Sequence, residues 1–222
     1  MDATNTLPVT NDDDDEMLAS LWEVWKTSLQ ESYYGWTSLD QWIASGRVGF
    51  DPSHPHHRVN RLDLYGCRLK GPIPSQLECL SSLTQLNFSH NELTGLPPEV
   101  GQLTSLIRLN LSGNMLKDLP PEIGRLSFLQ RLYLSRNQLR SLPPEVGCLS
   151  SLQVLDIDHS RLTSLPPEMG RLSSLTRLDL IANQLTSLPP EIGLLSSLLE
   201  LWLSHNQLTS LPLEIGHLSS LQ

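Results

Sequence analysis

The feature that most constrains this chain is a repeat of 23 residues. Units begin at Leu83, Leu106, Leu129, Leu152, Leu175 and Leu198, and a seventh opens at Leu221. The units approximate the pattern LxxLxLxxNxLxxLPPExGxLxx. A period in the twenties predicts a solenoid, because a single unit cannot bury its apolar face except against the units beside it.

The composition excludes two other ways of using so much leucine. The chain has 48 leucines against 7 valines and 8 isoleucines, and the leucines are spaced at intervals. A membrane span needs about 20 consecutive apolar residues, which this spacing does not provide. Most of the 16 prolines and 13 glycines recur at regular positions, which excludes a coiled coil.

The spacing within a unit predicts an α/β fold. In the LxLxx portion, apolar and polar residues alternate with period two, which is typical of a strand with one buried face. Units that repeat in one direction require parallel pairing, so we expect one long curved sheet on the concave face of a right-handed solenoid. The LPPExG segment predicts a short 3₁₀ or helical turn on the convex side, with the glycine ending the turn.

A recurrent asparagine follows most of the expected strands. A buried amide both donates to and accepts from the main chain of adjacent turns, and this position holds Asn91, Asn114, Asn137, Asn183 and Asn206. Cys67 and Ser160 occupy the same position in their units. We expect them to make weaker hydrogen bonds, so the turn at Ser160 should be locally less stable. Cys67 and Cys148 are expected to be buried, structural thiols.

Residues 1–58 are not repeats, but they hold four of the five tryptophans. We interpret residues 1–15 as an acidic disordered tail, residues 16–58 as a helical cap, and residues 59–222 as about seven repeats, the first of 24 residues. One face of the first expected helix carries Met17, Leu18, Leu21, Trp22, Trp25 and Leu29. A second short helix is expected, with Ser38 and Gln41 as its capping box and Gly46 as its stop.

The repeated motif resembles that of the leucine-rich repeat superfamily over roughly residues 59–222. The LPPEIGxL segments are similar to the intracellular, Ras-group-related type. The unit VNRLDLYGCRLKGPIPSQLECLSS, which begins at Val59, instead resembles the LxGxIP repeat of plant receptors. The segment from Trp36 to Val59 is similar to the cap before such repeats, without the cysteine pair of the extracellular form. The resemblance implies a protein-binding module in signalling or recognition.

Charge and cysteine content indicate the compartment and exclude some partners. Of the net charge of −9, residues 1–58 carry −7. This chain has no dense stripe of Lys and Arg side chains, so nucleic acid and anionic membranes are disfavoured as partners. A membrane-surface role for the first helix is disfavoured, because Lys26 is its only base before Arg47. An odd number of cysteines and a start without signal-peptide character favour a cytoplasmic protein.

Catalytic motifs are not found in the sequence. It contains no GxxxxGK[ST] loop, GxSxG elbow or HExxH pair. His54, His56 and His57 are the one local cluster of metal-ligating side chains, and we interpret it as an exposed loop because prolines flank it. We therefore expect no catalytic activity, no metal and no cofactor.

The outward strand residues provide the candidate binding surface. Exposed aromatic and arginine side chains dominate the energetics of protein interfaces. The candidate protein-binding residues are Arg108, Arg131, Tyr133, Arg136, Asp156, Asp158, His159, Arg177, Asp179 and Trp202. A purely structural interpretation stays open, in which Arg177 pairs with Asp156 or Asp179 and the polar face binds nothing.

We expect a non-enzymatic scaffold whose partner is a protein, with a small GTPase or another signalling protein as candidates. The alternative is the sensing part of a larger enzyme, such as a Roco-type GTPase or a receptor kinase. The last full unit leaves leucines and a strand edge without a polar cap, which favours either a longer chain or self-association through that end.

Overall fold

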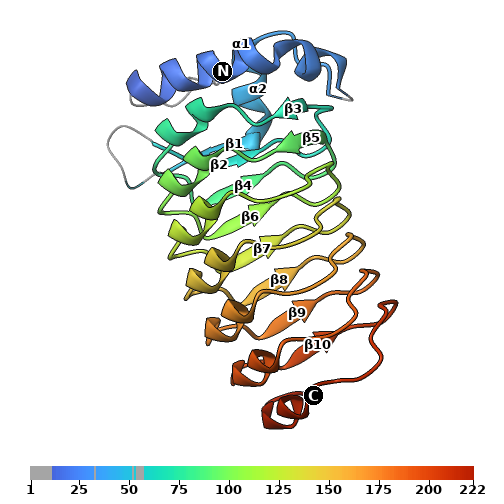
Figure 1. Cartoon of the computed structure of the whole chain (residues 1–222). Coiled ribbons are helices and arrows are strands. Elements are labelled where there is room, and N and C mark those ends of the chain that lie inside the picture. Colours follow the sequence, from blue (N-terminus) through green and yellow to red (C-terminus); the bar gives the residue numbers. More distant parts are fainter. Residues whose placement is uncertain (1–11, 33, 52, 54–57) are drawn as a thin grey trace.

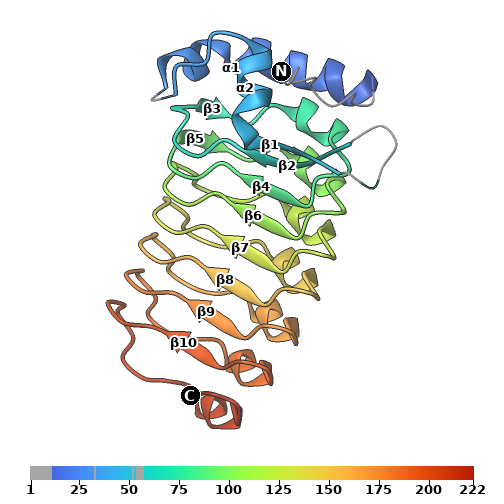
Figure 2. The same ribbon diagram turned by 180° about the vertical axis from the view of Figure 1, so that it is seen from behind.

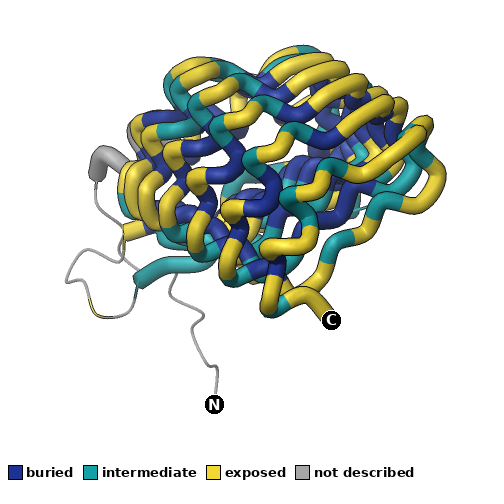
Figure 3. Tube along the Cα trace, turned by 60° about the horizontal axis from the view of Figure 1, so that its bottom comes forward, coloured by how far each residue is buried: buried dark blue, intermediate teal, exposed yellow. Residues whose placement is uncertain are grey.

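The computed structural model describes residues 12–32, 34–51, 53 and 58–222, and these form a solenoid with a helical cap at one end (Figure 1). The expected α/β leucine-rich repeat architecture is confirmed: parallel strands line one side of each turn, and 3₁₀ turns line the other (Figures 1 and 2). Buried positions recur at the same place in successive turns (Figure 3).

The cap is formed by α1 (Asp12–Glu31), α2 (Leu39–Trp42), the π-helical turn η1 (Ile43–Arg47) and β1 (Val48–Phe50). The expected apolar face of α1 is buried at Leu18, Leu21, Trp22, Trp25 and Leu29. The helix packs against the first 3₁₀ turn of the solenoid. It starts at Asp12, four residues before the expected cap boundary at 16. Residues 1–11 and the side chain of Met17 lie outside the described part of the chain.

The short helix α2 begins as its sequence predicts. Ser38 is its N-cap, and the Ser38 Oγ accepts a hydrogen bond of 3.3 Å from the backbone N–H of Gln41. The Gln41 Oε1 in turn accepts a hydrogen bond from the backbone N–H of Thr37, one residue earlier than in a standard capping box. Gly46, expected to stop the helix, has a non-helical φ of 75° and lies one residue before the end of η1.

The long sheet contains eight strands in the order β1-β2-β4-β6-β7-β8-β9-β10. Its repeat strands are β2 (Val59–Asp63), β4 (Gln85–Asn87), β6 (Arg108–Asn110), β7 (Arg131–Tyr133), β8 (Val154–Asp156), β9 (Arg177–Asp179) and β10 (Glu200–Trp202). These seven are parallel, as expected. The sequence did not indicate β1, which pairs antiparallel with β2, nor the small parallel sheet of β3 (Lys70–Pro72) and β5 (Glu92–Gly95).

Each repeat returns through a 3₁₀ turn, as its prolines predict. The turns are η2 (Ser75–Cys79), η3 (Pro98–Gln102), η4 (Pro121–Arg125), η5 (Pro144–Cys148), η6 (Pro167–Arg171), η7 (Pro190–Leu194) and η8 (Leu213–His217). The expected role of their glycines was wrong. None of the glycines in η3 to η7 has a positive φ; each is needed because the main chain of the next turn comes too close for a side chain.

The asparagine positions form the expected ladder between turns. Asn137 is representative: its Oδ1 accepts from the N–H of Leu116, and its Nδ2 donates to the carbonyls of Leu111 and Leu134. The ladder is interrupted at Ser160, whose Oγ is buried without a hydrogen-bond partner. Ser160 thus makes none of the weaker bonds expected of it, because its short side chain does not reach the main chain of the neighbouring turn.

Candidate protein-binding face

The open face of the long sheet consists of the side chains that point away from the leucine core. From β2 to β9 the leucine at the aligned position of each strand is buried. The residues before it align across the sheet as Arg61, Gln85, Arg108, Arg131, Val154, Arg177 and Glu200. The residues after it align as Asp63, Asn87, Asn110, Tyr133, Asp156, Asp179 and Trp202. Both columns have the register that the sequence predicts.

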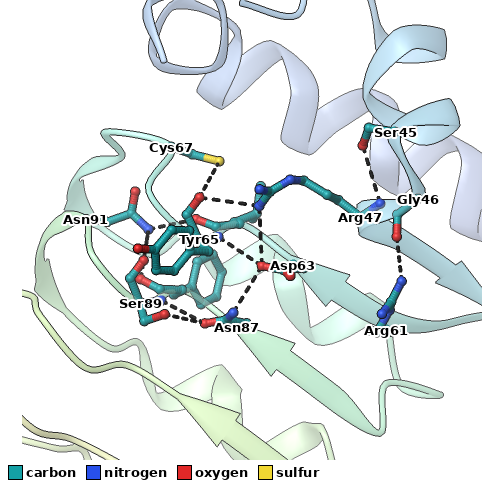
Figure 4. Close-up of polar contacts among 12 residues, drawn as sticks. Ser45, Gly46, Arg47, Arg61, Asp63, Tyr65, Cys67, Asn87, Ser89 and Asn91 are labelled. Atoms are coloured by element: carbon teal, nitrogen blue, oxygen red, sulfur yellow. Dashed lines mark hydrogen bonds and ion pairs between the residues drawn. The ribbon is translucent and has the colours of Figure 1, made fainter. Parts of the chain in front are cut away.

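At the cap end, the polar groups of this face are used to hold the cap in place (Figure 4). The Asp63 Oδ1 lies 3.5 Å from the Arg47 guanidinium and accepts a hydrogen bond of 3.0 Å from Asn87. Arg47 also donates to the carbonyl of Tyr65, and its guanidinium lies 3.9 Å from the centre of the Tyr34 ring. Because these groups are already paired, this end of the face has little capacity left for a ligand.

A shallow groove of about 170 Å³ follows on the same face. It is lined by Arg61, Leu62, Asp63, Gln85, Leu86, Asn87, Arg108 and Asn110. The Arg61 guanidinium donates to the carbonyl of Gly46 (Figure 4), whereas Arg108 contacts an aromatic ring instead. Arg108 therefore marks the point where the face changes from cap contacts to side chains available to a partner.

Two arginine–aromatic pairs lie on the open face. The guanidinium of Arg108 lies 5.1 Å from the ring centre of Tyr133, and that of Arg177 lies 4.2 Å from the ring centre of Trp202. Trp202 is 40% exposed. Tyr133 and Trp202 are three strands apart, or about 14 Å at the usual spacing of neighbouring strands. They form two separate contact points.

An acidic patch lies between the two pairs. The Ser135 hydroxyl donates a hydrogen bond of 2.5 Å to Asp156. The His159 Nδ1 lies 2.6 Å from a carboxylate oxygen of Asp158. Asp179 is paired with Asp156 in the sheet register and is 5% exposed. The patch therefore combines two half-buried carboxylates, those of Asp156 and Asp158, with the buried carboxylate of Asp179.

The environments of the patch shift two of its carboxyl pKa values in opposite directions. Burial raises the pKa of Asp179 and outweighs the hydrogen bond from the N–H of Ile181, and the nearby carboxylate of Asp156 raises this pKa further. Burial alone would also raise the pKa of Asp158, but the neighbouring Ser135 hydroxyl and the contact with His159 lower this pKa overall. Asp158 is therefore held as an anion beside a histidine, whereas the charge on Asp179 is disfavoured.

Sequence comparison places the repeats in a known family. A family model described as "leucine rich repeat" matches residues 81–139, 127–185 and 150–208. A second model with the same description matches residues 58–80. Together the matches cover more than half of the chain. The chain belongs to the leucine-rich repeat family. No match was found among the curated proteins searched.

Several solved leucine-rich repeat structures are similar to this chain. PEPR1, in the structure described as PEPR1–AtPEP1, is 30% identical over 96% of this chain and 31% of its own, with a TM-score of 0.79. The ectodomain of the plant receptor kinase GASSHO1/SCHENGEN3 from Arabidopsis thaliana is 40% identical over 73% of this chain and 20% of its own, with a TM-score of 0.67. The Leptospira interrogans protein LIC12759 is 34% identical over 73% and 47%, with a TM-score of 0.65. This chain spans less than half the length of each.

The leucine-rich repeat geometry separates the ten candidate residues into groups. Arg131, Tyr133 and Asp156 lie on β7 and β8, with Asp158 beside them after β8. Arg177, Asp179 and Trp202 lie on β9 and β10, and Arg108 lies on β6. The remaining two, Arg136 and His159, have positive φ values of 55° and 51°. They are equivalent residues of the turn before the asparagine position, at one edge of the open face.

The expected pairing of Arg177 with Asp179 is present at 3.8 Å. Several other contacts on the open face of the repeats were not anticipated. The cation–π pairing of Arg108 with Tyr133 and the hydrogen bond from Ser135 to Asp156 join residues of neighbouring repeat units. Glu200 lies 3.8 Å from Arg177. When the repeat units are aligned, the residues of each contact occupy the same or adjacent positions in successive units. This is the signal in the sequence that could have found the contacts. Side-chain rotamers decide which neighbours meet, and the sequence does not specify them.

The structure also bears on the other expected sites of this leucine-rich repeat chain. Cys67 is buried as expected, and burial raises the pKa of its thiol to about 12. Cys148 is exposed, contrary to expectation, because it lies on the outer side of η5. The histidine cluster at 54–57 lies outside the described residues. Among the residues described, no group of three or more His, Cys, Asp or Glu side chains could hold a metal, and no helix is long and apolar enough to span a membrane.

Proposed function

We propose that this leucine-rich repeat protein is a non-enzymatic module that binds a protein partner on its open face. The observation that carries the proposal is the pair of arginine–aromatic contacts, Arg108 with Tyr133 and Arg177 with Trp202, on either side of an acidic patch. Aromatic and arginine side chains contribute most of the energy in protein interfaces. Fixed strand pairing holds these groups in place before a partner arrives, which lowers the entropic cost of binding.

The similar structures support the binding role. The GASSHO1/SCHENGEN3 ectodomain is described in complex with CASPARIAN STRIP INTEGRITY FACTOR 2, and PEPR1 is described with AtPEP1. This chain aligns with only part of each receptor. Its own partner is therefore inferred from the chemistry of the open face: a protein surface with an apolar or aromatic contact at each end and basic groups between them.

The test is affinity capture from a lysate with mass spectrometry, followed by binding measurements with each captured protein. The variants Tyr133→Ala and Trp202→Ala should each weaken specific binding about tenfold, since truncating a residue at the centre of an interface costs about 1–2 kcal/mol. Phe128→Ala is the matched control, because Phe128 is an aromatic residue 63% exposed that lies outside the strands. Equal affinities for all three variants would contradict the proposal.

We further propose that the protein acts in the cytoplasm as a signalling or recognition scaffold of the Ras-group-related subtype, with one plant-type repeat. The LPPExG motif in consecutive units supports the subtype. The free thiols of Cys67 and Cys148 fit a reducing compartment. A small GTPase is a candidate partner for such a scaffold. Fractionation of cells that produce the tagged protein tests the location, and binding to purified small GTPases tests the partner.

The alternative function is that these repeats serve as the sensing part of a larger enzyme, such as a Roco-type GTPase or a receptor kinase. Its support is that a similar structure is the ectodomain of a receptor kinase, and that this chain aligns with 20% of it. Sequencing the full transcript distinguishes the two functions. An open reading frame that encodes a GTPase or kinase domain would favour the alternative, and a frame limited to repeats would favour the scaffold.

Self-association through the β10 side of the solenoid is a separate proposal. Leu199, Leu211 and Leu213 on this side are 38%, 50% and 93% exposed. Exposed apolar side chains beside a strand edge favour pairing with another chain. Light scattering should show a dimer whose fraction rises with concentration and falls in a Leu199→Glu/Leu213→Glu variant. A monomer at all concentrations would contradict self-association.

A further inference from the structure

A second polar surface lies on the segments that follow the asparagine ladder, outside the long sheet. Lys117 and Arg140 occupy the same position in successive units, and Arg161 lies two positions earlier in the unit after them. The leucines next to them in sequence, Leu116, Leu139 and Leu162, are fully buried, whereas the three cations are exposed. Because a buried leucine lies next to each exposed cation, three basic side chains from three adjacent turns point outward on one flank.

These side chains border a trough that crosses several turns. One hollow of about 570 Å³ is lined by Lys117, Asp118, Gln138, Arg140, Ser141 and Arg161. A second hollow of about 440 Å³ is lined by Arg140, Arg161, Thr163 and Gln184. Because Arg140 and Arg161 line both hollows, the two hollows adjoin from turn to turn, and we call them together the trough. Amide and hydroxyl side chains between the cations supply further hydrogen-bonding groups.

The charge of the trough contrasts with that of the whole chain. Three cations and one carboxylate, Asp118, line it, whereas the chain as a whole carries −9. Within the described part of the chain, Lys117, Arg140 and Arg161 form no ion pair. Like charges on neighbouring segments destabilise a fold unless an anion offsets them. The trough thus presents unpaired donors and positive charge to solvent.

We propose that this trough binds an acidic peptide segment of a partner protein, at a site separate from the open face. An extended peptide fits because the cations are spread over consecutive turns, and the amide and hydroxyl groups between them suit a peptide main chain. Carboxylates at alternate positions of the peptide would each meet a different cation. Three cations are too few for nucleic acid or for an anionic membrane surface.

The experiment measures the anisotropy of fluorescent hexaglutamate added to the full chain at low salt, with hexaglutamine as the neutral control. Hexaglutamate should bind and hexaglutamine should not, and added salt should weaken binding. The variant Arg140→Gln/Arg161→Gln should bind at least about fivefold more weakly, since it removes two exposed charge pairs. The matched control, Arg125→Gln/Arg171→Gln, removes two exposed cations from the turns η4 and η6, and should stay within about twofold.

Further outcomes distinguish other occupants. Equal weakening by both double variants, or absence of hexaglutamate binding, would overturn the proposal. Complete displacement of the peptide by an equal concentration of inorganic phosphate would indicate a small-anion site and would also overturn it. If Tyr133→Ala/Trp202→Ala abolished hexaglutamate binding, the peptide would lie on the open face and this site would be rejected. Loss of a concentration-dependent dimer in Arg140→Gln/Arg161→Gln would identify the occupant as a second copy, contrary to the proposal.

Discussion

Gly170 packs against the main chain of Glu191 in the next turn of the solenoid, so closely that a β-carbon at Gly170 would lie 2.6 Å from the Glu191 carbonyl oxygen. We expect Gly170→Ala to lower the free energy of unfolding by about 1–3 kcal/mol, because two turns must separate to accommodate a methyl group. Urea denaturation followed by circular dichroism measures the change.

Gly216 provides the control for this prediction. It occupies the equivalent position in η8, and no atom lies within 4 Å of the site of a β-carbon there. Gly216→Ala should leave stability unchanged or raise it by up to about 1 kcal/mol, since alanine restricts the unfolded chain. If both substitutions had the same effect, close packing between turns would not be the reason for the regular spacing of these glycines along the chain.

The interruption of the ladder at Ser160 predicts a stabilising substitution. An asparagine there would reach the N–H of Leu139 and the carbonyls of Leu134 and Ile157, by analogy with Asn137. Ser160→Asn should raise the free energy of unfolding by about 1 kcal/mol, and Asn137→Ser should lower it by at least as much. Native-state hydrogen exchange should show slower exchange at Leu139 in Ser160→Asn. Unchanged exchange at that amide would contradict the expected local loss of stability at Ser160.

Arg47 joins the cap to the first repeat strand. Its guanidinium contacts Asp63 and the carbonyl of Tyr65 and stacks on Tyr34. Arg47→Met should keep the apolar stem but lose these bonds, so hydrogen exchange in α1 and β1 should accelerate while that of β6 to β9 is unchanged. Arg47→Lys should rescue the cap only in part, because an ammonium lacks the planar fork that serves several acceptors. Full rescue by lysine would show that charge alone holds the cap.

The acidic patch predicts opposite pH responses for two carboxyl groups. A pKa raised by folding penalises the ionised form, so Asp179 lowers stability as pH rises through its folded-state pKa. A pKa lowered by folding does the reverse, so Asp158 contributes stability that is lost as pH falls through its folded-state pKa. At neutral pH, Asp179→Asn should raise the melting temperature and Asp158→Asn should lower it.

Melting curves between about pH 3 and pH 8 test this pair of predictions. The difference between Asp179→Asn and the parent chain should disappear as pH falls to the ordinary aspartate pKa of about 4. The difference for Asp158→Asn should persist to a lower pH before it disappears. Asp118→Asn serves as the control, because Asp118 is exposed and has no ion pair among the described residues. Effects of the same sign for Asp179 and Asp158 would contradict the assignment.

Much of the candidate site followed from the sequence because the repeat fixes register. Once Leu132 and Leu155 are equivalent, Arg131 must lie beside Val154 and Tyr133 beside Asp156, as observed. The burial of Asp179 did not follow, since it depends on how side chains of neighbouring strands cover it. The trough beside Arg140 was also not anticipated, because Arg161 occupies a different position in its unit from Lys117 and Arg140.

The sequence by itself determined the parallel solenoid, the 3₁₀ turns and the inward positions of the leucines, because these depend on the period of the pattern and on local backbone preferences. The tertiary structure decided what depends on the distance between turns. Gly170 is required by the approach of Glu191, Ser160 is left unpaired, and Arg47 finds its acceptors on β2 and the residues that follow it. Such contacts join atoms more than fifteen residues apart, and their geometry is set only when the turns stack.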